Sequence, residues 1–279
     1  MTEKLYDLSP LFEDGATMWP RFANEIQVRA RAFAGVRSTG WHNENHPGWF
    51  DMGQPFPFQE SLPGGMAGAW VGHLHVGTHV DAPIYCIPEG ITADKIPLEN
   101  LYGTGVIIDM RNKGKWGIIT AEDFEKATPK IEAGDFVVVN TGWQKWLRPD
   151  KGYEYYHYYP GLLPSAAEWL VKKKVKAIAG TWPTCDHSLS FAPLEPLGKC
   201  MPQLHHDYVR ETGKEPGPEF SYGFEGCLTM LLKNGVSCIE NAGGDIDEVT
   251  GIRCTLCAWP FRMEDTDGAM VRLVALVEE

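Results

Sequence analysis

The chain has 279 residues, of which 43% are hydrophobic and 22% charged, and its formal net charge is −12. This composition is typical of a soluble globular protein, and the negative charge disfavours nucleic acid and anionic membranes as partners. The first residues do not show the basic region followed by an apolar run that is typical of a signal peptide. No apolar stretch approaches the ~20 residues that a membrane helix needs. Because its seven cysteines are odd in number and scattered, we expect a cytoplasmic protein without a disulfide framework or signal peptide.

The N-terminal part of the chain differs in composition from the rest. Residues 1–70 are rich in proline, glycine and aromatic residues and have few periodic runs. They predict a largely irregular extension packed on a single domain that spans residues 1–279. The first strands are expected at 71–80 and 105–109. Thr120 and Asp123 have the spacing of a capping box, which predicts a helix start.

The remaining elements alternate between strands and helices. Ser165 and Glu168 repeat the capping-box spacing and predict a helix that runs to about Lys174. Gly235 is a typical C-cap residue and ends an expected helix over 225–234. Apolar runs predict strands at 136–140, 175–180, 236–240, 253–261 and 270–277, of which the last two could pair. This order favours an α/β fold with a mixed sheet or open barrel flanked by helices.

Two segments leave alternatives open. The stretch from Trp143 to Tyr159 concentrates tryptophan and tyrosine in a loop-like region. It could form a lid or a subunit contact, since these residues anchor interfaces, or it could pack on its own domain. Cys254 and Cys257 form a lone C-x-x-C pair. A zinc ribbon would need a second pair, so packed structural thiols are the favoured interpretation.

A histidine-rich segment predicts a metal site. His75, His79 and Asp81 are ligand types for borderline metals such as zinc and manganese. Four residues of straight strand span roughly 13 Å, whereas ligands lie about 2.0–2.2 Å from a shared ion. The chain must therefore bend between the histidines, and Gly77 is where bending costs least. We expect these three side chains to bind one divalent ion, Zn²⁺ or Mn²⁺.

The same segment carries a resemblance to a known family. From His75 to Pro83 the chain reads H-x-G-T-H-x-D-x-P, which resembles the signature of the metal-dependent cyclase family of hydrolases. That family includes kynurenine formamidases, isatin hydrolases and trans-dienelactone hydrolases, and the resemblance implies its fold. Further similar segments are Asn140–Trp143, Pro160–Leu162, Ala166–Leu170, Val175–Gly180, Leu231–Val236, Ile239–Asn241, Asp267–Gly268 and Val271–Leu276.

Two departures from the family pattern bear on the ion count. Tyr85 and Leu228 stand where many members carry histidines that help to hold a second ion, so the resemblance implies a single ion here. Glu240 matches a family site carboxylate, and it could handle protons or bind the metal. Tyr85 could donate a hydrogen bond during catalysis, although a phenol is a poor base at neutral pH. His187 follows a strand end and is a candidate for substrate binding.

Together these features predict a metal-dependent hydrolase. It would open a cyclic amide, imide or lactone, or cleave a small amide, through a metal-activated water. A metal-dependent lyase or dehydratase on the same site, and a non-catalytic metal-binding protein, are the alternatives. The partner is expected to be a small-molecule substrate, and the resemblance implies a homodimer or homotetramer.

Overall fold

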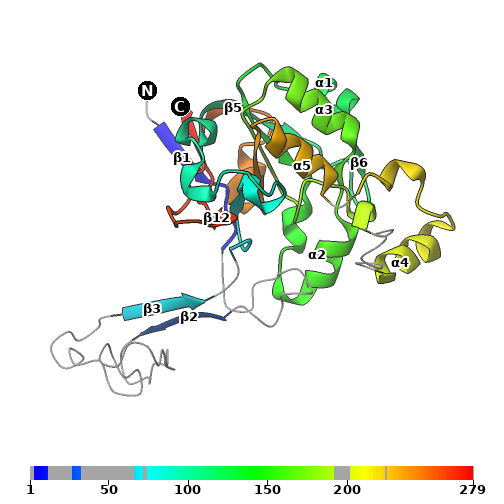
Figure 1. The fold of residues 1–279 in the computed structure, drawn as a ribbon, viewed down its shortest axis with the longest axis horizontal. Coiled ribbons are helices and arrows are strands. Elements are labelled where there is room, and N and C mark those ends of the chain that lie inside the picture. The colour runs from blue at the N-terminus through cyan, green and yellow to red at the C-terminus, as the bar shows by residue number, and fades with distance from the viewer. Residues whose placement is uncertain are drawn as a thin grey trace. The chain divides into compact units, whose positions relative to one another are not determined.

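The computed structural model describes residues 3–11, 27–32, 66–71, 74–191, 202–223 and 225–278 (Figure 1). The chain divides into two compact units. The smaller one comprises Glu13–Gly15 and Asn24–His73, and it contains strands β2 (Gln27–Ala32) and β3 (Met66–Val71), which pair antiparallel. The larger one contains the rest of the described chain. That residues 1–70 pack on a single domain stays a prediction.

A nine-stranded mixed sheet forms the centre of the larger unit. Its strand order is β1-β13-β11-β5-β7-β9-β10-β4-β12. Strands β5, β7, β9 and β10 run parallel, and the strands on either side of this block pair antiparallel. The bounds are β1 Glu3–Asp7, β4 His79–Asp81, β5 Tyr102–Asp109, β7 Phe136–Asn140, β9 Ala177–Gly180, β10 Ser237–Glu240, β11 Arg253–Cys257, β12 Gly268–Met270 and β13 Val274–Glu278.

Helices flank this sheet, which confirms the predicted α/β class with a mixed sheet. Helix α3 contacts both α1 and α5, and Figure 1 shows the three side by side. The α-helices are α1 Ala121–Lys126, α2 Gly152–Tyr158, α3 Pro164–Lys173, α4 Pro202–Thr212 and α5 Gly226–Lys233. Short 3-10 helices span Pro83–Tyr85, Ala93–Lys95, Leu98–Leu101, Trp143–Trp146, Pro149–Lys151, Ser188–Phe191, Pro218–Phe220 and Gly244–Glu248, and strands β6 (Ile118–Ile119) and β8 (Gly161–Leu162) form a small second sheet.

Apolar cores cover both faces of the large sheet. On β7, Val137 and Val139 belong to the core that includes the α3 and α5 side chains, whereas Phe136 and Val138 belong to the other core. Successive strand residues point to opposite faces, so a continuous apolar run is what a doubly covered strand requires. Burial of each large aliphatic side chain contributes about 1.5–3 kcal/mol, which makes these central strands the rigid frame of the unit.

Several predicted elements need correction. The strand expected at 71–80 is not continuous, because its described residues 74–78 form no strand, while Val71 ends β3 and β4 begins at His79. The strand expected at 253–261 ends at Cys257, ahead of Pro260, which has no N–H for a sheet ladder. The strand expected at 270–277 is split into β12, the edge strand at one end of the sheet order, and β13, the second strand from the other end. The predicted pairing of the segments 253–261 and 270–277 is confirmed, because β11 pairs with β13.

One of the two predicted capping boxes is confirmed and the other is wrong. The Thr120–Asp123 capping box is present at α1. The second box is wrong, because α3 begins at Pro164 with Leu163 as its N-cap residue, so Ser165 lies inside the first turn. Proline fits that turn since the N–H it lacks would have no helical partner there.

The aromatic stretch is helical rather than loop-like. Trp143, Tyr155, Tyr156 and Tyr159 are buried in the core beside the sheet, whereas Tyr153 is 41% exposed. These contacts favour packing on the stretch's own domain over a lid. Cys254 and Cys257 are partly buried free thiols on β11, in agreement with a structural role.

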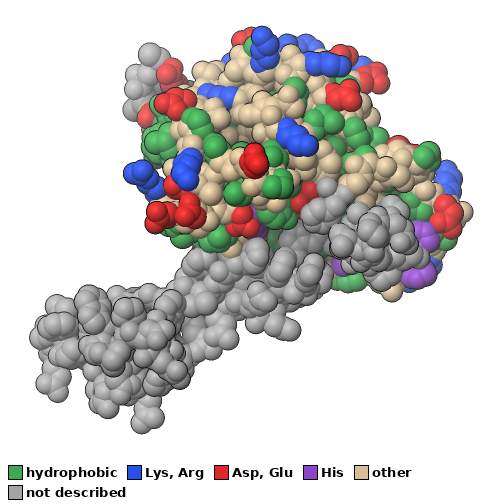
Figure 2. Space-filling model, viewed as in Figure 1, with side chains coloured by type: hydrophobic (Ala, Val, Ile, Leu, Met, Phe, Trp, Pro, Cys, Tyr) green, Lys and Arg blue, Asp and Glu red, His purple; other side chains and the backbone are tan. Residues whose placement is uncertain are grey.

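The surface and the helix lengths bear on partners. On the visible face of the larger unit, acidic and basic side chains are interspersed (Figure 2). Among the residues that the structure describes, no helix combines the length and apolar character needed to cross a membrane. The cytoplasmic location stays a prediction.

Candidate metal centre

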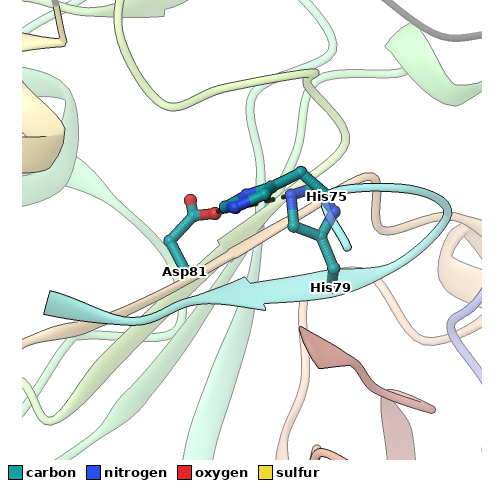
Figure 3. A group of neighbouring side chains, drawn as sticks. All are labelled: His75, His79 and Asp81. Carbon is teal, nitrogen blue, oxygen red and sulfur yellow. Dashed lines mark hydrogen bonds and ion pairs between the residues drawn. The ribbon is translucent and has the colours of Figure 1, made fainter. Parts of the chain in front are cut away.

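The structure brings His75, His79 and Asp81 together. One ligand atom from each lies within 4.8 Å of the others, and the three side chains converge in Figure 3. His79 and Asp81 point to one side of β4, as expected for residues two apart on a strand. Gly77 has a φ of 58°, a left-handed conformation that glycine adopts readily, and the chain turns there to return His75 to its partners. The predicted bend at Gly77 is therefore confirmed.

The sheet registers place other groups beside these ligands. Strand β4 lies between β10 and β12, with Glu240 opposite His79 and Gly268 opposite Asp81. As a result, His79 Nε2 lies 3.3 Å from Glu240 Oε2. A Cβ atom on Gly268 would lie 2.8 Å from Cε1 of His75, so this position has room only for glycine while the ring stays in place.

The protonation of His79 follows from its neighbours. Its Nδ1 lies 2.9 Å from the carbonyl oxygen of Gly77. A carbonyl can only accept, so Nδ1 carries the hydrogen and Nε2 faces the carboxylates of Asp81 and Glu240, at 3.5 and 3.3 Å. A metal-binding histidine is commonly held in this way, with its second nitrogen donating to the main chain.

Asn241 supports this turn, although its residue type alone did not mark it as a site residue. Its side-chain amide donates to the Gly77 carbonyl at 2.8 Å, and its own carbonyl oxygens accept hydrogen bonds from the hydroxyls of Tyr155 and Thr78 at 2.6 and 2.9 Å. The backbone of Asn241 is left-handed, with φ 58°. Asparagine tolerates this region better than most residues, which was the only local signal available.

The electrostatics of the cluster are those of buried, mutually paired groups. Burial lowers the pKa of both imidazoles, but hydrogen bonds and charges from the carboxylates outweigh it, and the pKa rises to about 9 for His75 and about 10 for His79. Burial raises the pKa of Asp81, but hydrogen bonds from the two histidines hold it well below its usual range. Burial and the charge of Asp81 raise the pKa of Glu240 to about 7, against the opposing effect of His79.

The donor set fits a divalent ion. Two imidazoles and a carboxylate converge, and Asp81 Oδ2 is buried without a hydrogen-bond partner among the described residues. Buried polar atoms are rarely left in that state. Since histidine must lose a proton to bind a metal, the raised pKa values mean that protons compete for this site.

Tyr85 lies at the edge of the cluster. Its ring centroid is 4.5 Å from that of His75, and its hydroxyl donates to Glu225 Oε1 at 3.1 Å. Burial, followed by the charges of Glu225 and Asp81, raises the pKa of the phenol far above its ordinary value, so it stays protonated. Glu225, which no sequence motif marks, is a buried carboxylate at the N-terminus of α5.

His187 has a different environment. Its Nε2 donates to the carbonyl of Trp116 at 3.0 Å, and its Nδ1 accepts from the N–H of Leu189 at 3.1 Å. The residue is fully buried, and burial lowers its pKa to about 4, so the ring is neutral. A substrate-binding role for His187 stays a prediction, and in this structure both of its nitrogens are engaged by the main chain.

Comparison with known proteins shows the family. Residues 6–187 match the Cyclase family, described as "Putative cyclase". A kynurenine formamidase of Bacillus cereus is 25% identical over 225 residues, which cover 79% of this chain and 87% of that protein. An isatin hydrolase A from Ralstonia solanacearum (18% identity, TM-score 0.67) and an isatin hydrolase bound to the product analogue thioisatinate (17%, 0.69) share the fold, with 99% of this chain and 92% and 93% of theirs covered. The match spans well over half of the chain and includes the segment with His75, His79 and Asp81, so this protein belongs to the Cyclase family.

Proposed function

We propose that this protein is a metal-dependent hydrolase that opens a cyclic amide or imide, or cleaves a small open-chain amide. The observation that carries the proposal is the buried convergence of His75, His79 and Asp81. Three protein ligands are typical of a catalytic site, which keeps a coordination position open, whereas structural sites are usually closed by a fourth ligand. The similarity to a kynurenine formamidase supports an amide as the substrate class.

One divalent ion, zinc or manganese, would be held by these three residues. When bound, such an ion polarises a carbonyl group and lowers the pKa of water to about 7. We infer a single ion, because Tyr85 and Leu228 replace two expected nitrogen ligands. The Leu228 side chain has no donor atom for a metal, and it is fully buried in the apolar core.

Glu240 is the residue best placed to hold and move a proton. Its carboxylate is buried and lies 3.3 Å from His79 Nε2. A pKa of about 7 lets it exist in both protonation states near neutral pH, which is what general acid–base catalysis requires. The same position allows it to bind the metal, and the experiment below separates the two roles.

The test is the Glu240→Gln variant with an exposed carboxylate variant, Glu248→Gln, as control. With a panel of cyclic and open-chain amides, we expect kcat of Glu240→Gln to fall by roughly 10²–10⁴ and that of the control to stay unchanged. Metal content close to wild type would assign proton transfer, and reduced content would assign metal binding. Wild-type kcat in Glu240→Gln would refute the catalytic role.

Product analysis tests the reaction class. Hydrolysis in water enriched in a heavy oxygen isotope must place solvent oxygen in the product. A lyase or dehydratase on the same site would release a product without it. Unlabelled product would therefore overturn the proposal.

We also infer a homodimer or homotetramer. Symmetric dimers are the commonest oligomers, and Tyr153 is an exposed aromatic residue of the kind that anchors interfaces. Light scattering at micromolar concentration measures the mass, and a monomer would contradict this inference.

A further inference from the structure

Glu225 is placed unusually for a buried carboxylate. It precedes helix α5 with φ 47° and ψ 42°, in the left-handed region that non-glycine residues seldom adopt. Only 5% of the residue is exposed. Both features are unfavourable for a glutamate, and strained residues of this kind cluster at functional sites.

Helix capping does not explain this arrangement. The Glu225 side chain makes no capping hydrogen bond. The free N–H groups of Cys227 and Leu228 at the start of α5 donate instead to the two oxygens of Asp186, each at 2.9 Å. Because Asp186 serves the helix, the carboxylate of Glu225 is left for another purpose.

Ion pairing does not explain it either. No lysine, arginine or histidine of the described part of the chain lies within salt-bridge distance of Glu225. Burial, followed by the charges of Glu240 and Asp81, raises its pKa well above the ordinary value. A carboxyl group held among other carboxylates is costly, so a compensating role is expected.

The contacts of Glu225 lead to the metal centre. Its Oε1 accepts the hydroxyl of Tyr85 at 3.1 Å, and its Oε2 lies 3.7 Å from the thiol of Cys86. The ring of Tyr85 lies against the ring of His75 at 4.5 Å. Residues 85 and 86 lie four and five positions after Asp81, at the end of the 3-10 helix Pro83–Tyr85 and just beyond it, so one short segment joins the candidate ligands to this carboxylate.

We propose that Glu225 is a positioning residue: it holds the Tyr85 side chain with its ring against that of His75, so that the hydroxyl oxygen accepts a hydrogen bond from the substrate of the proposed hydrolase. A phenol at the end of a freely rotating side chain would sample several positions. One hydrogen bond at the hydroxyl and one ring contact at His75 restrict it to a single orientation. Positioning of this kind can contribute substantially to rate, because the contact is formed before the reaction starts.

The test is a double-mutant cycle with Tyr85→Phe and Glu225→Leu. Tyr85→Phe keeps the ring beside His75 and removes only the hydroxyl. We expect each single variant to lower kcat/KM by about 10–100-fold, as partners of site residues do. The double variant should be no worse than Tyr85→Phe within about threefold, because Glu225 acts only through that hydroxyl. Losses that multiply in the double variant would overturn the proposal.

Two further variants separate positioning from other roles. Glu225→Gln keeps an oxygen that can accept the hydrogen bond of the Tyr85 hydroxyl. We therefore expect its activity to stay within about threefold of wild type, because exchanging one acceptor oxygen for another changes the hydrogen-bond energy little. A glutamine variant as impaired as Glu225→Leu would mean that the carboxylate itself transfers a proton, and would overturn the proposal. Cys86→Ala, which removes the contact at the other oxygen, serves as the matched control with near-wild-type activity.

A binding measurement keeps this inference distinct from the proposed function. Calorimetry with benzoate, a carboxylate of the product class, is made on the metal-loaded wild type and on each variant. Equal weakening in Tyr85→Phe, Glu225→Leu and the double variant supports positioning even if the wild type hydrolyses no amide, which would refute only the proposed function. An active wild type in which Glu225→Leu changes neither kcat/KM nor benzoate affinity refutes this inference alone.

Discussion

Replacement of Asn241 by alanine should weaken both the fold and the metal centre. The change removes the donor of the Gly77 carbonyl and the acceptor of the Tyr155 hydroxyl, which are 2.8 and 2.6 Å away. Asn241 is only 4% exposed, so water cannot replace these partners without rearrangement. The Gly77 carbonyl keeps the hydrogen bond from His79 Nδ1, so its lost bond costs about 0.5–1.5 kcal/mol, whereas the unsatisfied Tyr155 hydroxyl costs about 1–3 kcal/mol. We therefore expect a loss of about 1.5–4.5 kcal/mol in the free energy of unfolding.

The Asn241→Ala variant should also bind the metal ion more weakly than the wild type. The Gly77 carbonyl also accepts the Nδ1 hydrogen of His79, so a displaced carbonyl releases the ring that presents Nε2 to the ion. Loss of such a supporting partner typically costs 10–100-fold in affinity. Urea unfolding and a competitive zinc titration measure the two effects. Asn234→Ala, which removes an exposed side-chain hydrogen bond on α5, is the control with little change in either.

The reasoning would be refuted by a specific pair of results. If Asn241→Ala unfolds within about 0.5 kcal/mol of Asn234→Ala, the range expected for ordinary surface substitutions, the buried hydrogen bonds do not stabilise the turn. If its zinc affinity also equals that of the wild type, the turn does not orient His79. Asn241→Gly, which suits the left-handed backbone, shows how much of any loss comes from backbone strain alone.

Three further predictions concern the site and its surroundings. Elemental analysis should find about one divalent ion per chain in the wild type and almost none in His79→Ala, because that variant lacks one of only three protein ligands. Similar metal content in the two proteins would exclude this site. Gly268→Ala should lower metal affinity much more than stability, because the new Cβ would lie 2.8 Å from Cε1 and 2.9 Å from Nε2 of His75; an unchanged zinc titration would contradict the packing. His187 has a folded-state pKa of about 4, below its ordinary value of 6.5, so the unfolded chain binds more protons between these pH values. The stability of the wild type relative to His187→Gln should therefore fall as pH decreases from about 6.5 to 4, by up to about 3 kcal/mol, and a pH-independent difference in denaturant unfolding would disprove it.

The convergence of the three candidate metal ligands could be predicted from sequence because they are local. His75, His79 and Asp81 lie within one short segment, and the ligand types, the alternation along a strand and the glycine that permits a bend are all visible there. The strand at 136–140 and the Thr120–Asp123 capping box were predictable for the same reason, since each depends on a few consecutive residues. The Ser165 capping box is wrong because the helix begins at Pro164, so that its N-cap residue is Leu163, two positions before Ser165.

The partners of those ligands were decided by the tertiary structure. Glu240 reaches His79 only because β10 and β4 pair in one particular register, and nothing in either segment specifies it. Glu225 reaches Tyr85 across 140 positions of sequence, and Asn241 reaches Gly77 across 164. The split of the last predicted strand into β12 and β13 has the same origin, because an apolar pattern shows that a segment is buried but not which strands it joins. Sequence thus determines which residues can bind a metal and where the chain can bend, whereas long-range packing decides which buried carboxylates and amides surround them.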